Sequence, residues 1–299
     1  MKNKKAVLLL IVFLLSIVVL CAVFLFLLRV DPGIDEEAER ELKKVEVTHP
    51  LTVHFIDAGQ GDATLLQGPD FTILIDAGRH DDDKVIRYLT STSVQHLDLL
   101  IGTHPHADHI GQFPQIMEAY PVNEVWMSGD VHTTRTFERA LDAILESDAN
   151  YIEPRAGESY TIGSAIVDVL HPGQLNGDLN HGSIVVRITF SDVSILFMGD
   201  AELLAEEEIL RSEHPVQADI LKIGHHGSRS SSSKEFLQKV DPDIAIYSAA
   251  RGNSYGHPHP EVMERLTKKG MDVYGTDMHG TIRIVSDGLI YSVELDQGD

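Results

Sequence analysis

The chain has 299 residues and a formal net charge of −22, with 46 acidic and 24 basic side chains. This acidity disfavours extended nucleic-acid binding, because proteins that contact many phosphates usually present a basic surface. The single cysteine, Cys21, excludes an intrachain disulfide. Frequent glycine and low aromatic content favour a turn-rich enzyme with β-structure over a helical bundle.

The N-terminal segment is strongly apolar. Residues 6–28 form an apolar run that only Ser16 interrupts, and Lys2, Lys4 and Lys5 precede it. A helix of this length spans the roughly 30 Å hydrocarbon core of a bilayer. A cleaved signal peptide is the alternative, but its apolar region should be shorter and should end at a small-x-small site. We therefore expect one uncleaved transmembrane helix.

The charges around this helix predict its orientation. Lysines precede it, whereas residues 31–49 carry many acidic side chains and few large apolar ones. The positive-inside rule places the N-terminus in the cytoplasm and the following domain outside the cell. We expect residues 1–30 to be the anchor with its cytoplasmic lysines, residues 31–49 an acidic stalk, and residues 50–299 one large domain. The protein is thus expected to be a single-pass protein of the cell membrane.

The large domain alternates predicted strands and helices. In its first half, strands are predicted at residues 51–57, 63–67, 71–76, 97–103 and 122–126, and helices at 82–92 and 134–147. In its second half, strands are predicted at 165–170, 183–190, 193–198 and 218–223, a helix at 202–211, and further elements at 233–240, 244–248, 261–269, 271–274, 281–285 and 289–295. Two β-rich halves with helices predict two sheets packed face to face, a four-layer αββα sandwich.

Four strong metal-binding side chains follow the predicted strand at 97–103: His104, His106, Asp108 and His109. Unpaired, they are costly to desolvate, and charged imidazoles repel each other; a divalent metal resolves both problems. His104 and His106 lie two apart on extended chain, so they can point to the same side and hold one ion. Asp108 and His109 follow where the chain turns, so the motif predicts a second ion.

Two later segments supply further candidates. Asp200 follows the predicted strand at 193–198, and a carboxylate there can bridge two ions, although it could instead cap the next helix. His225 and His226 are adjacent and flanked by glycine. Adjacent side chains diverge, so we expect one to bind metal and the other to face the substrate. We favour His226 as the ligand and His225 on the substrate side, but the pattern leaves this assignment open.

Histidines in two other segments are further candidates, but the sequence leaves their roles open. His181 precedes the predicted strand at 183–190 and could be the third imidazole of the first ion, with His171 as its competitor. Residues 253–260 form a loop stiffened by prolines, from which His257 and Tyr255 could reach a leaving group or phosphate. A surface-loop role is the alternative for each of these histidines.

These motifs together resemble the metallo-β-lactamase superfamily, and in particular the metallo-β-lactamase-like domain of ComEC/Rec2 competence proteins. The motifs that carry the resemblance are His54-Phe55-Ile56-Asp57-Ala58-Gly59-Gln60-Gly61-Asp62-Ala63, Asp76-Ala77-Gly78, the run from His104 to His109, Met198-Gly199-Asp200, Gly224-His225-His226-Gly227-Ser228 and Tyr255-Gly256-His257-Pro258. The chain departs from that pattern at His181, where competence proteins often have Asn, and in having one predicted membrane span instead of a polytopic channel.

The resemblance implies a dinuclear metallohydrolase in which a metal-bridging hydroxide attacks the substrate. One ion would be held by His104, His106 and His181, the other by Asp108, His109 and His226, with Asp200 as the bridge. Imidazole-rich ligation suits Zn²⁺ first, with Mn²⁺ or Fe²⁺ also tolerated.

Phosphodiester hydrolysis is the favoured activity. Asp108 would orient the nucleophile, and His225 or His257 would stabilise or protonate the leaving oxygen. The acidic charge suits a small phosphoester, such as phosphocholine on a surface polymer, better than nucleic acid, which stays possible. Ester, lactone or β-lactam hydrolysis on the same fold is the alternative activity, because fold does not fix function. A catalytically silent, membrane-tethered binding module is the alternative outside the enzymes.

Overall fold

Two β-sheets form the framework of the part of the chain that the computed structural model describes, residues 50–296. The predicted anchor at residues 6–28 and the predicted stalk at 31–49 lie outside the described residues. Within residues 50–296, no helix is both long and apolar enough to cross a bilayer. The anchor and the boundaries of the three predicted segments therefore stay predictions.

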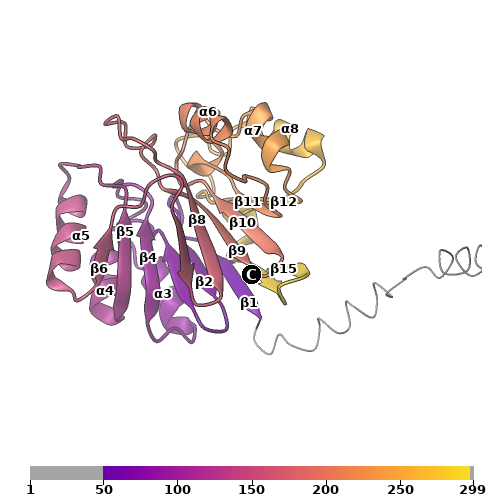
Figure 1. The fold of residues 1–299 in the computed structure, drawn as a ribbon. Helices are drawn as coiled ribbons and strands as arrows, with labels where there is room; N and C mark the ends of the chain where they lie inside the picture. The colour runs from indigo at the N-terminus through magenta and orange to yellow at the C-terminus, as the bar shows by residue number, and fades with distance from the viewer. Residues whose placement is uncertain (1–49, 297–299) are drawn as a thin grey trace, which may run out of the picture. The chain divides into compact units, whose positions relative to one another are not determined.

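The first sheet has the order β15-β14-β1-β2-β3-β4-β5-β6, and the second has the order β13-β12-β11-β10-β9-β8-β7 (Figure 1). The strands of the first sheet are β1 (Leu51–Phe55), β2 (Thr64–Gln67), β3 (Thr72–Ile75), β4 (Leu97–Gly102), β5 (Val122–Met127), β6 (Asn150–Ile152), β14 (Ile282–Ser286) and β15 (Tyr291–Leu295). Those of the second are β7 (Ser159–Ile162), β8 (Ala165–His171), β9 (Val185–Phe190), β10 (Val193–Phe197), β11 (Ile220–Lys222), β12 (Ile244–Tyr247) and β13 (Asp272–Gly275).

Helices connect many of these strands. They are α3 (Lys84–Ser91), α4 (Phe113–Ala119), α5 (Arg135–Glu146), α6 (Leu203–Arg211), α7 (Lys234–Val240), α8 (Pro260–Lys269), α9 (Thr276–His279) and the short 3-10 helix η1 (His225–Gly227). Local sequence defines several helix ends. The hydroxyl of Thr134 accepts from the backbone amide of Phe137 at the start of α5, and Gly270 ends α8 in a left-handed conformation.

Three apolar clusters hold the layers together. The first lies between the sheets, where Phe55 stacks on Phe197 with ring centroids 6.2 Å apart. The second packs α3, α4 and α5 on the outer face of the first sheet, and the third packs α6, α7 and α8 on the outer face of the second. This arrangement confirms the predicted two-sheet sandwich with helices outside.

The structure also contains elements that the sequence patterns did not indicate. Helix α4 begins at Phe113-Pro114, and its proline is compatible with a first helical turn, where no amide needs a partner. Strands β6 and β7 are short and largely exposed, so their sequences lack the apolar pattern of a buried strand. These segments owe their structure to pairing with β5 and β8.

Parallel pairing aligns the ends of several strands in each sheet. Strands β3, β4 and β5 are parallel in the first sheet, and β10, β11 and β12 are parallel in the second. The carboxyl ends of parallel strands share one edge of their sheet, where ligand sites of α/β proteins commonly form. The histidine run follows β4, Asp200 follows β10 and η1 follows β11. The topology therefore gathers the predicted site residues at these strand ends.

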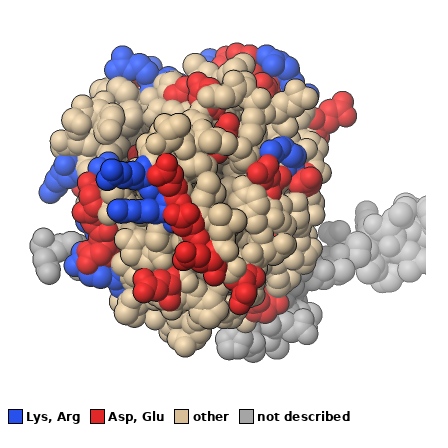
Figure 2. Space-filling view, turned by 90° about the vertical axis from the view of Figure 1, so that its left-hand side faces the viewer, with Lys and Arg blue, Asp and Glu red and all other residues tan. Residues whose placement is uncertain are grey.

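The charged surface contains no continuous basic area on the face that Figure 2 presents. This is the side of Figure 1 on which α4 and α5 lie, and acidic and basic side chains are interspersed on it. The basic residues of α5, Arg135 and Arg139, alternate with Glu138 and Asp142 along the helix.

A buried ion pair connects the two sheets. Lys222, at the end of β11, places its Nζ 2.7 Å from Oδ2 of Asp62, which precedes β2 in the other sheet. Both side chains are almost fully buried. Burial opposes ionisation of the Asp62 carboxyl, but Lys222 lowers its pKa below the usual range. Removing either partner would leave the other charge buried and unpaired.

We predict that Lys222→Met lowers the free energy of unfolding by about 3–5 kcal/mol, the usual cost of breaking a buried ion pair. The double variant Lys222→Met with Asp62→Asn should recover part of this loss, because it leaves no unpaired charge. Urea denaturation followed by circular dichroism measures both. Lys268→Met, at an exposed lysine, is the control. A Lys222→Met protein as stable as the control would contradict the structural role of this pair.

Candidate metal centre

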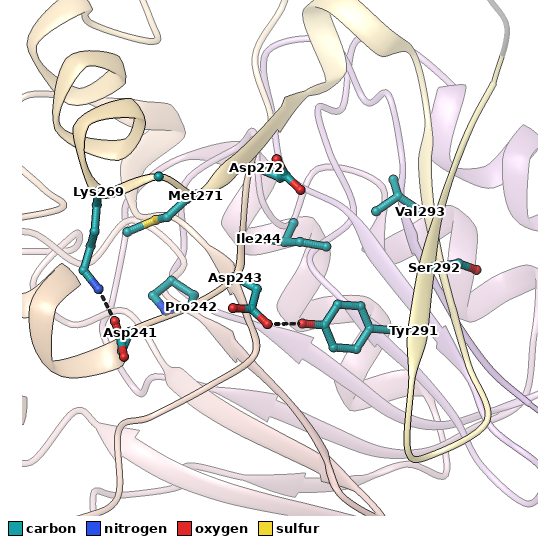
Figure 3. Close-up of a pocket in the computed structure, with 11 residues that line it drawn as sticks. Asp241, Pro242, Asp243, Ile244, Lys269, Met271, Asp272, Tyr291, Ser292 and Val293 are labelled. Carbon is teal, nitrogen blue, oxygen red and sulfur yellow. Dashed lines mark hydrogen bonds and ion pairs between the residues drawn. The ribbon is translucent and has the colours of Figure 1, made fainter. Parts of the chain in front are cut away.

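Two cavities in the structure differ in how their polar side chains are paired. The larger, of about 590 Å³, lies beside β12, β13 and β15 (Figure 3). Four of its polar side chains form two pairs: Lys269 with Asp241, and the Tyr291 hydroxyl with Asp243 at 2.7 Å. The predicted site residues instead line a cavity of about 360 Å³ at the strand ends.

The first group of potential ligands comprises His104, His106 and Asp200, whose ligand atoms all lie within 4.8 Å of one another. Nε2 of His104 is 2.9 Å from Nδ1 of His106 and 3.6 Å from Oδ2 of Asp200. The His104 side chain is fully buried, while His106 is partly exposed to the cavity. The structure therefore brings the first two predicted histidines together with Asp200.

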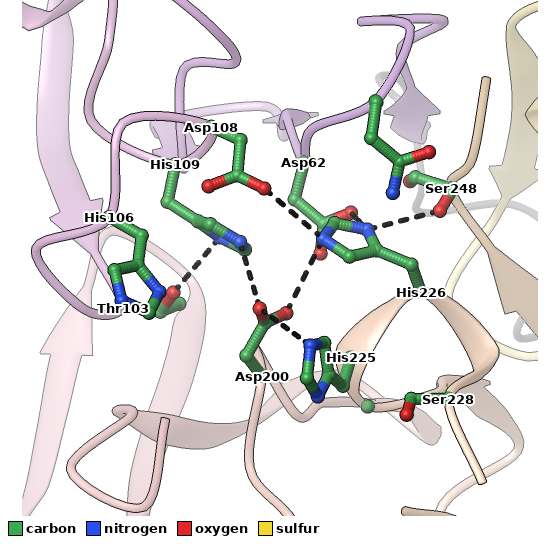
Figure 4. A network of polar contacts seen from close by, with 12 residues as sticks. Asp62, Thr103, His106, Asp108, His109, Asp200, His225, His226, Ser228 and Ser248 are labelled. Carbon is green, nitrogen blue, oxygen red and sulfur yellow. Dashed lines mark hydrogen bonds and ion pairs between the residues drawn. The ribbon is translucent and has the colours of Figure 1, made fainter. Parts of the chain in front are cut away.

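The second group comprises Asp108, His109 and His226, again within 4.8 Å of one another. Nε2 of His226 lies 3.6 Å from Oδ2 of Asp108. Asp200 reaches this group too, with Oδ2 at 3.4 Å from Nε2 of His109 and Oδ1 at 3.6 Å from Nε2 of His226 (Figure 4). One carboxylate thus faces both groups, as a bridging ligand must.

Three of the potential ligand atoms lack a hydrogen bond. Among residues 50–296, Nε2 of His109, Nε2 of His226 and Oδ1 of Asp200 are buried without a hydrogen-bond partner. Leaving such atoms unpaired costs free energy. Here all three are atoms that could bind a metal ion. The donor set, imidazoles with carboxylates, suits zinc first and tolerates manganese or iron. The residues present therefore fit two divalent ions.

The other ring nitrogen of each of these two imidazoles, Nδ1, forms a hydrogen bond that fixes the ring. Nδ1 of His226 donates to the carbonyl of Ser248 at 3.1 Å, which leaves Nε2 as the lone-pair nitrogen. Nδ1 of His109 donates to Oδ2 of Asp76 at 2.8 Å, and Asp76 also accepts from the Thr103 amide at 2.8 Å. Carboxylates and carbonyls in this position orient metal-binding histidines and raise their basicity.

The carboxylates and imidazoles of the site shift one another's pKa values. Burial opposes charge on each of them, but the carboxylates of Asp200 and Asp62 raise the pKa of His226 to about 10. Asp200 and Asp76 likewise raise the pKa of His109, despite its burial. Burial and the neighbouring His109 lower the pKa of His104 well below its usual value. Protonated His109 and His226 place positive charge beside Asp200, and metal ions would replace those protons.

The adjacent histidines diverge as expected. Both His225 and His226 adopt left-handed backbone conformations, with φ of 48° and 54°, which is uncommon outside glycine and frequent at functional sites. His226 joins the second ligand group. Nδ1 of His225 contacts Glu202 at 2.9 Å, and its Nε2 lies 3.8 Å from Asp200 on the cavity side.

His257 and Tyr255 also line this cavity. The two rings stack with centroids 5.7 Å apart, and His257 lies 5.4 Å from the ring of His225. The predicted substrate-side residues are therefore together at the mouth of the site.

The structure does not bring His181 to the first group. It places His181 with His171 and Glu208, and no group of potential ligands within residues 50–296 joins it to His104. The preceding residue, Asn180, lines the cavity instead, and its Oδ1 is buried without a hydrogen bond. The expected third imidazole is therefore not supported, and an amide oxygen stands at that side of the site.

Three residues to which the sequence analysis assigned no role contribute to the site. Asp76 and Asp62 stand behind His109 and His226, and Asn180 faces the cavity. Asp76 follows β3 and Asp62 follows a glycine-rich turn. A carboxylate after a strand end or a glycine-rich turn is compatible with a site role, but such a residue also has many other roles.

Comparison with known proteins supports the same reading of the fold. The family model of the metallo-beta-lactamase superfamily matches residues 56–251. ComE operon protein 3 of Bacillus subtilis is 30% identical over 284 residues, covering 88% of this chain and 35% of that protein. Recombination protein 2 of Haemophilus influenzae is 31% identical over 245 residues, covering 78% of this chain and 28% of that protein. The chain thus spans about a third of the length of these relatives.

A solved structure shares the fold at low sequence identity. The metallo-beta-lactamase fold protein YhfI from Bacillus subtilis superposes with a TM-score of 0.54 at 15% identity, covering 79% of this chain and 100% of that chain.

We predict that Asp76→Asn lowers the zinc affinity of the site by roughly 10–100-fold, the usual effect of removing a carboxylate behind a metal-binding histidine. Asparagine keeps the size of the side chain but cannot hold the His109 ring in the same way. A competition titration with a chromophoric chelator measures the affinity. Asp142→Asn, at an exposed position of α5, is the control. Unchanged zinc affinity in Asp76→Asn would show that Asp76 does not support a ligand.

Proposed function

The chain belongs to the metallo-beta-lactamase superfamily, and on that basis we propose that it is a dinuclear metal-dependent hydrolase of phosphodiesters. The observation that carries the proposal is the position of Asp200 between two groups of buried ligand atoms, beside an open cavity. Fold alone does not assign a reaction, whereas the geometry of this site favours metal-dependent hydrolysis.

Five side chains and one bridging carboxylate would hold the ions. His104 and His106 would hold one, Asp108, His109 and His226 the other, and Asp200 both, with Asn180 beside them. Divalent ions in such a site supply a water of lowered pKa and neutralise charge that develops on substrate oxygens. The side chains that face the cavity then determine how the substrate is positioned.

Asp108 and two histidines are placed to move protons. The Asp108 carboxylate is partly exposed at the cavity, where it can accept a hydrogen bond from the attacking water. Burial and the nearby charge of His226 lower the pKa of His257 to about 4, so at neutral pH its ring is uncharged. His225 and His257 lie together in the same cavity, where a ring N–H of either can donate a hydrogen bond to the leaving oxygen.

Size and charge favour a small substrate. A cavity of about 360 Å³ accommodates a phosphodiester with its immediate substituents. The net charge of −22 supplies little long-range attraction for a polyanion. We therefore propose a small diester or a diester group on a polymer as substrate, with nucleic acid the less favoured possibility. The apolar run at residues 6–28 further supports an enzyme anchored in the membrane with its site outside the cell.

We predict that the detergent-solubilised full-length chain hydrolyses bis(p-nitrophenyl) phosphate when loaded with Zn²⁺ or Mn²⁺. Asp200→Ala should lower kcat/KM by at least about 1,000-fold, since loss of the bridging ligand removes several kcal/mol of transition-state stabilisation. His257→Ala should lower kcat by roughly 100-fold without changing metal content, as expected for a neutral ring whose N–H donates a hydrogen bond to the leaving oxygen. Absorbance at the nitrophenolate band measures the rates.

Glu207→Ala, at an exposed site of α6, is the control and should keep the wild-type rate. A metal-loaded wild-type chain with no phosphodiester turnover would overturn the proposed activity, and turnover of a chromogenic ester or lactone by the same protein would replace it. Cleavage of single-stranded DNA that falls steeply with added salt would instead identify a nuclease.

A further inference from the structure

A second cluster of metal-binding side chains lies apart from the reaction centre and shares no residue with it. His171 ends β8, His181 lies in the loop that leads to β9, and Glu208 comes from α6. The two histidine side chains are only 2% and 6% exposed, whereas Glu208 is 37% exposed. Two buried imidazoles thus meet a carboxylate that opens to solvent.

The three side chains converge on the Glu208 carboxylate. Nε2 of His171 lies 3.3 Å from Oε2 of Glu208, and Nε2 of His181 lies 3.3 Å from Oε1. Tetrahedral zinc with nitrogen and oxygen ligands at roughly 2.0–2.1 Å sets those ligand atoms about 3.3 Å apart. The observed separations therefore match ligands of one ion and are longer than a strong hydrogen bond between a charged pair.

The hydrogen bonds of His171 create a conflict that a cation would resolve. Nδ1 of His171 lies 3.1 Å from the Ser183 carbonyl, which can only accept, so Nδ1 carries the proton. In a neutral ring Nε2 is then an acceptor, and it faces a carboxylate oxygen that is also an acceptor. Either a second proton on the ring or a metal ion removes this mismatch.

His181 makes the metal the better solution. Its ring centroid is 5.0 Å from that of His171, and its Nδ1 is buried without a hydrogen bond. Even if His181 is neutral and donates from Nε2 to Oε1, the buried His171 ring would still need a second proton at Nε2 to pair with Oε2. One divalent ion would satisfy both Nε2 atoms and the carboxylate together.

We propose that His171, His181 and Glu208 form a third divalent-metal site, suited to Zn²⁺, that fixes the loop between β8 and β9 to α6. A fourth position remains open to solvent on the Glu208 side, from which the ion can enter.

The site would act on the reaction centre through the loop it holds. Asn180 is next to His181 and points into the reaction cavity. Ser183, whose carbonyl binds His171, also accepts a hydrogen bond through its hydroxyl from the Asp200 amide at 3.2 Å. An ion between this loop and α6 therefore positions both Asn180 and the backbone of the bridging carboxylate. His171, His181 and Glu208 are positioning residues and touch no reacting atom.

The test is the metal content of the full-length chain after dialysis in buffered Zn²⁺, measured by inductively coupled plasma mass spectrometry. Glu208→Ala and His181→Ala should each lose one molar equivalent relative to the wild type. Glu207→Ala, the neighbouring acidic residue of α6, should lose none. The difference is independent of how many ions the reaction centre holds and of whether any substrate is hydrolysed, so it separates this inference from the proposed activity.

Hydrogen exchange provides a second readout that does not depend on metal counting. Zn²⁺ should slow exchange of the amides in residues 172–182 in the wild type and in Glu207→Ala, but not in Glu208→Ala. Circular dichroism establishes that each variant is folded. Equal zinc content and equal loop protection in Glu208→Ala and Glu207→Ala would overturn the proposal and leave a protonated histidine pair as the explanation.

Discussion

The structure depends on one carboxylate, Asp200, held between imidazoles that come from different strand ends. It is almost fully buried, and His104, His109 and His226 each place a ring nitrogen 3.4–3.6 Å from its oxygens. Burying these groups costs free energy unless a cation lies among them, because the carboxylate needs positive charge and the ring nitrogens need a partner. The fold therefore holds these groups in an arrangement suited to metal binding, although some of their polar atoms stay unpaired without a metal.

The two-sheet architecture explains how such an arrangement is maintained. Parallel strands in both sheets deliver the ligands at their carboxyl ends, and the buried Lys222–Asp62 pair connects the sheets directly behind His226. Gly199 has a φ of +51°, and a Cβ there would lie 2.9 Å from Thr103. A glycine is thus required where the Asp200 turn approaches the strand that carries the histidine run. Packing, backbone conformation and site chemistry support each other at this contact.

Much of the site could be predicted because metal ligands cluster in sequence. The histidine run, Asp200 and the paired histidines follow apolar strands, and the family resemblance implied that they would meet. The choice between Asn180 and His181 could not be predicted, since it depends on which of two adjacent side chains the loop turns inward. Helix α4 and the edge strands were missed because their structure comes from tertiary contacts instead of local periodicity. Asp62 and Asp76 act through a histidine, and a single sequence does not reveal such indirect contacts.

The central claim is that Asp200 bridges two ions. Anomalous X-ray diffraction from crystals of the zinc-loaded protein, collected on both sides of the zinc absorption edge, tests it most directly. We expect two peaks flanking the Asp200 carboxylate, about 3.5–4 Å apart as in other two-metal sites, one beside His104 and His106 and the other beside Asp108, His109 and His226. A single peak, or peaks that leave Asp200 without a metal neighbour, would contradict the account.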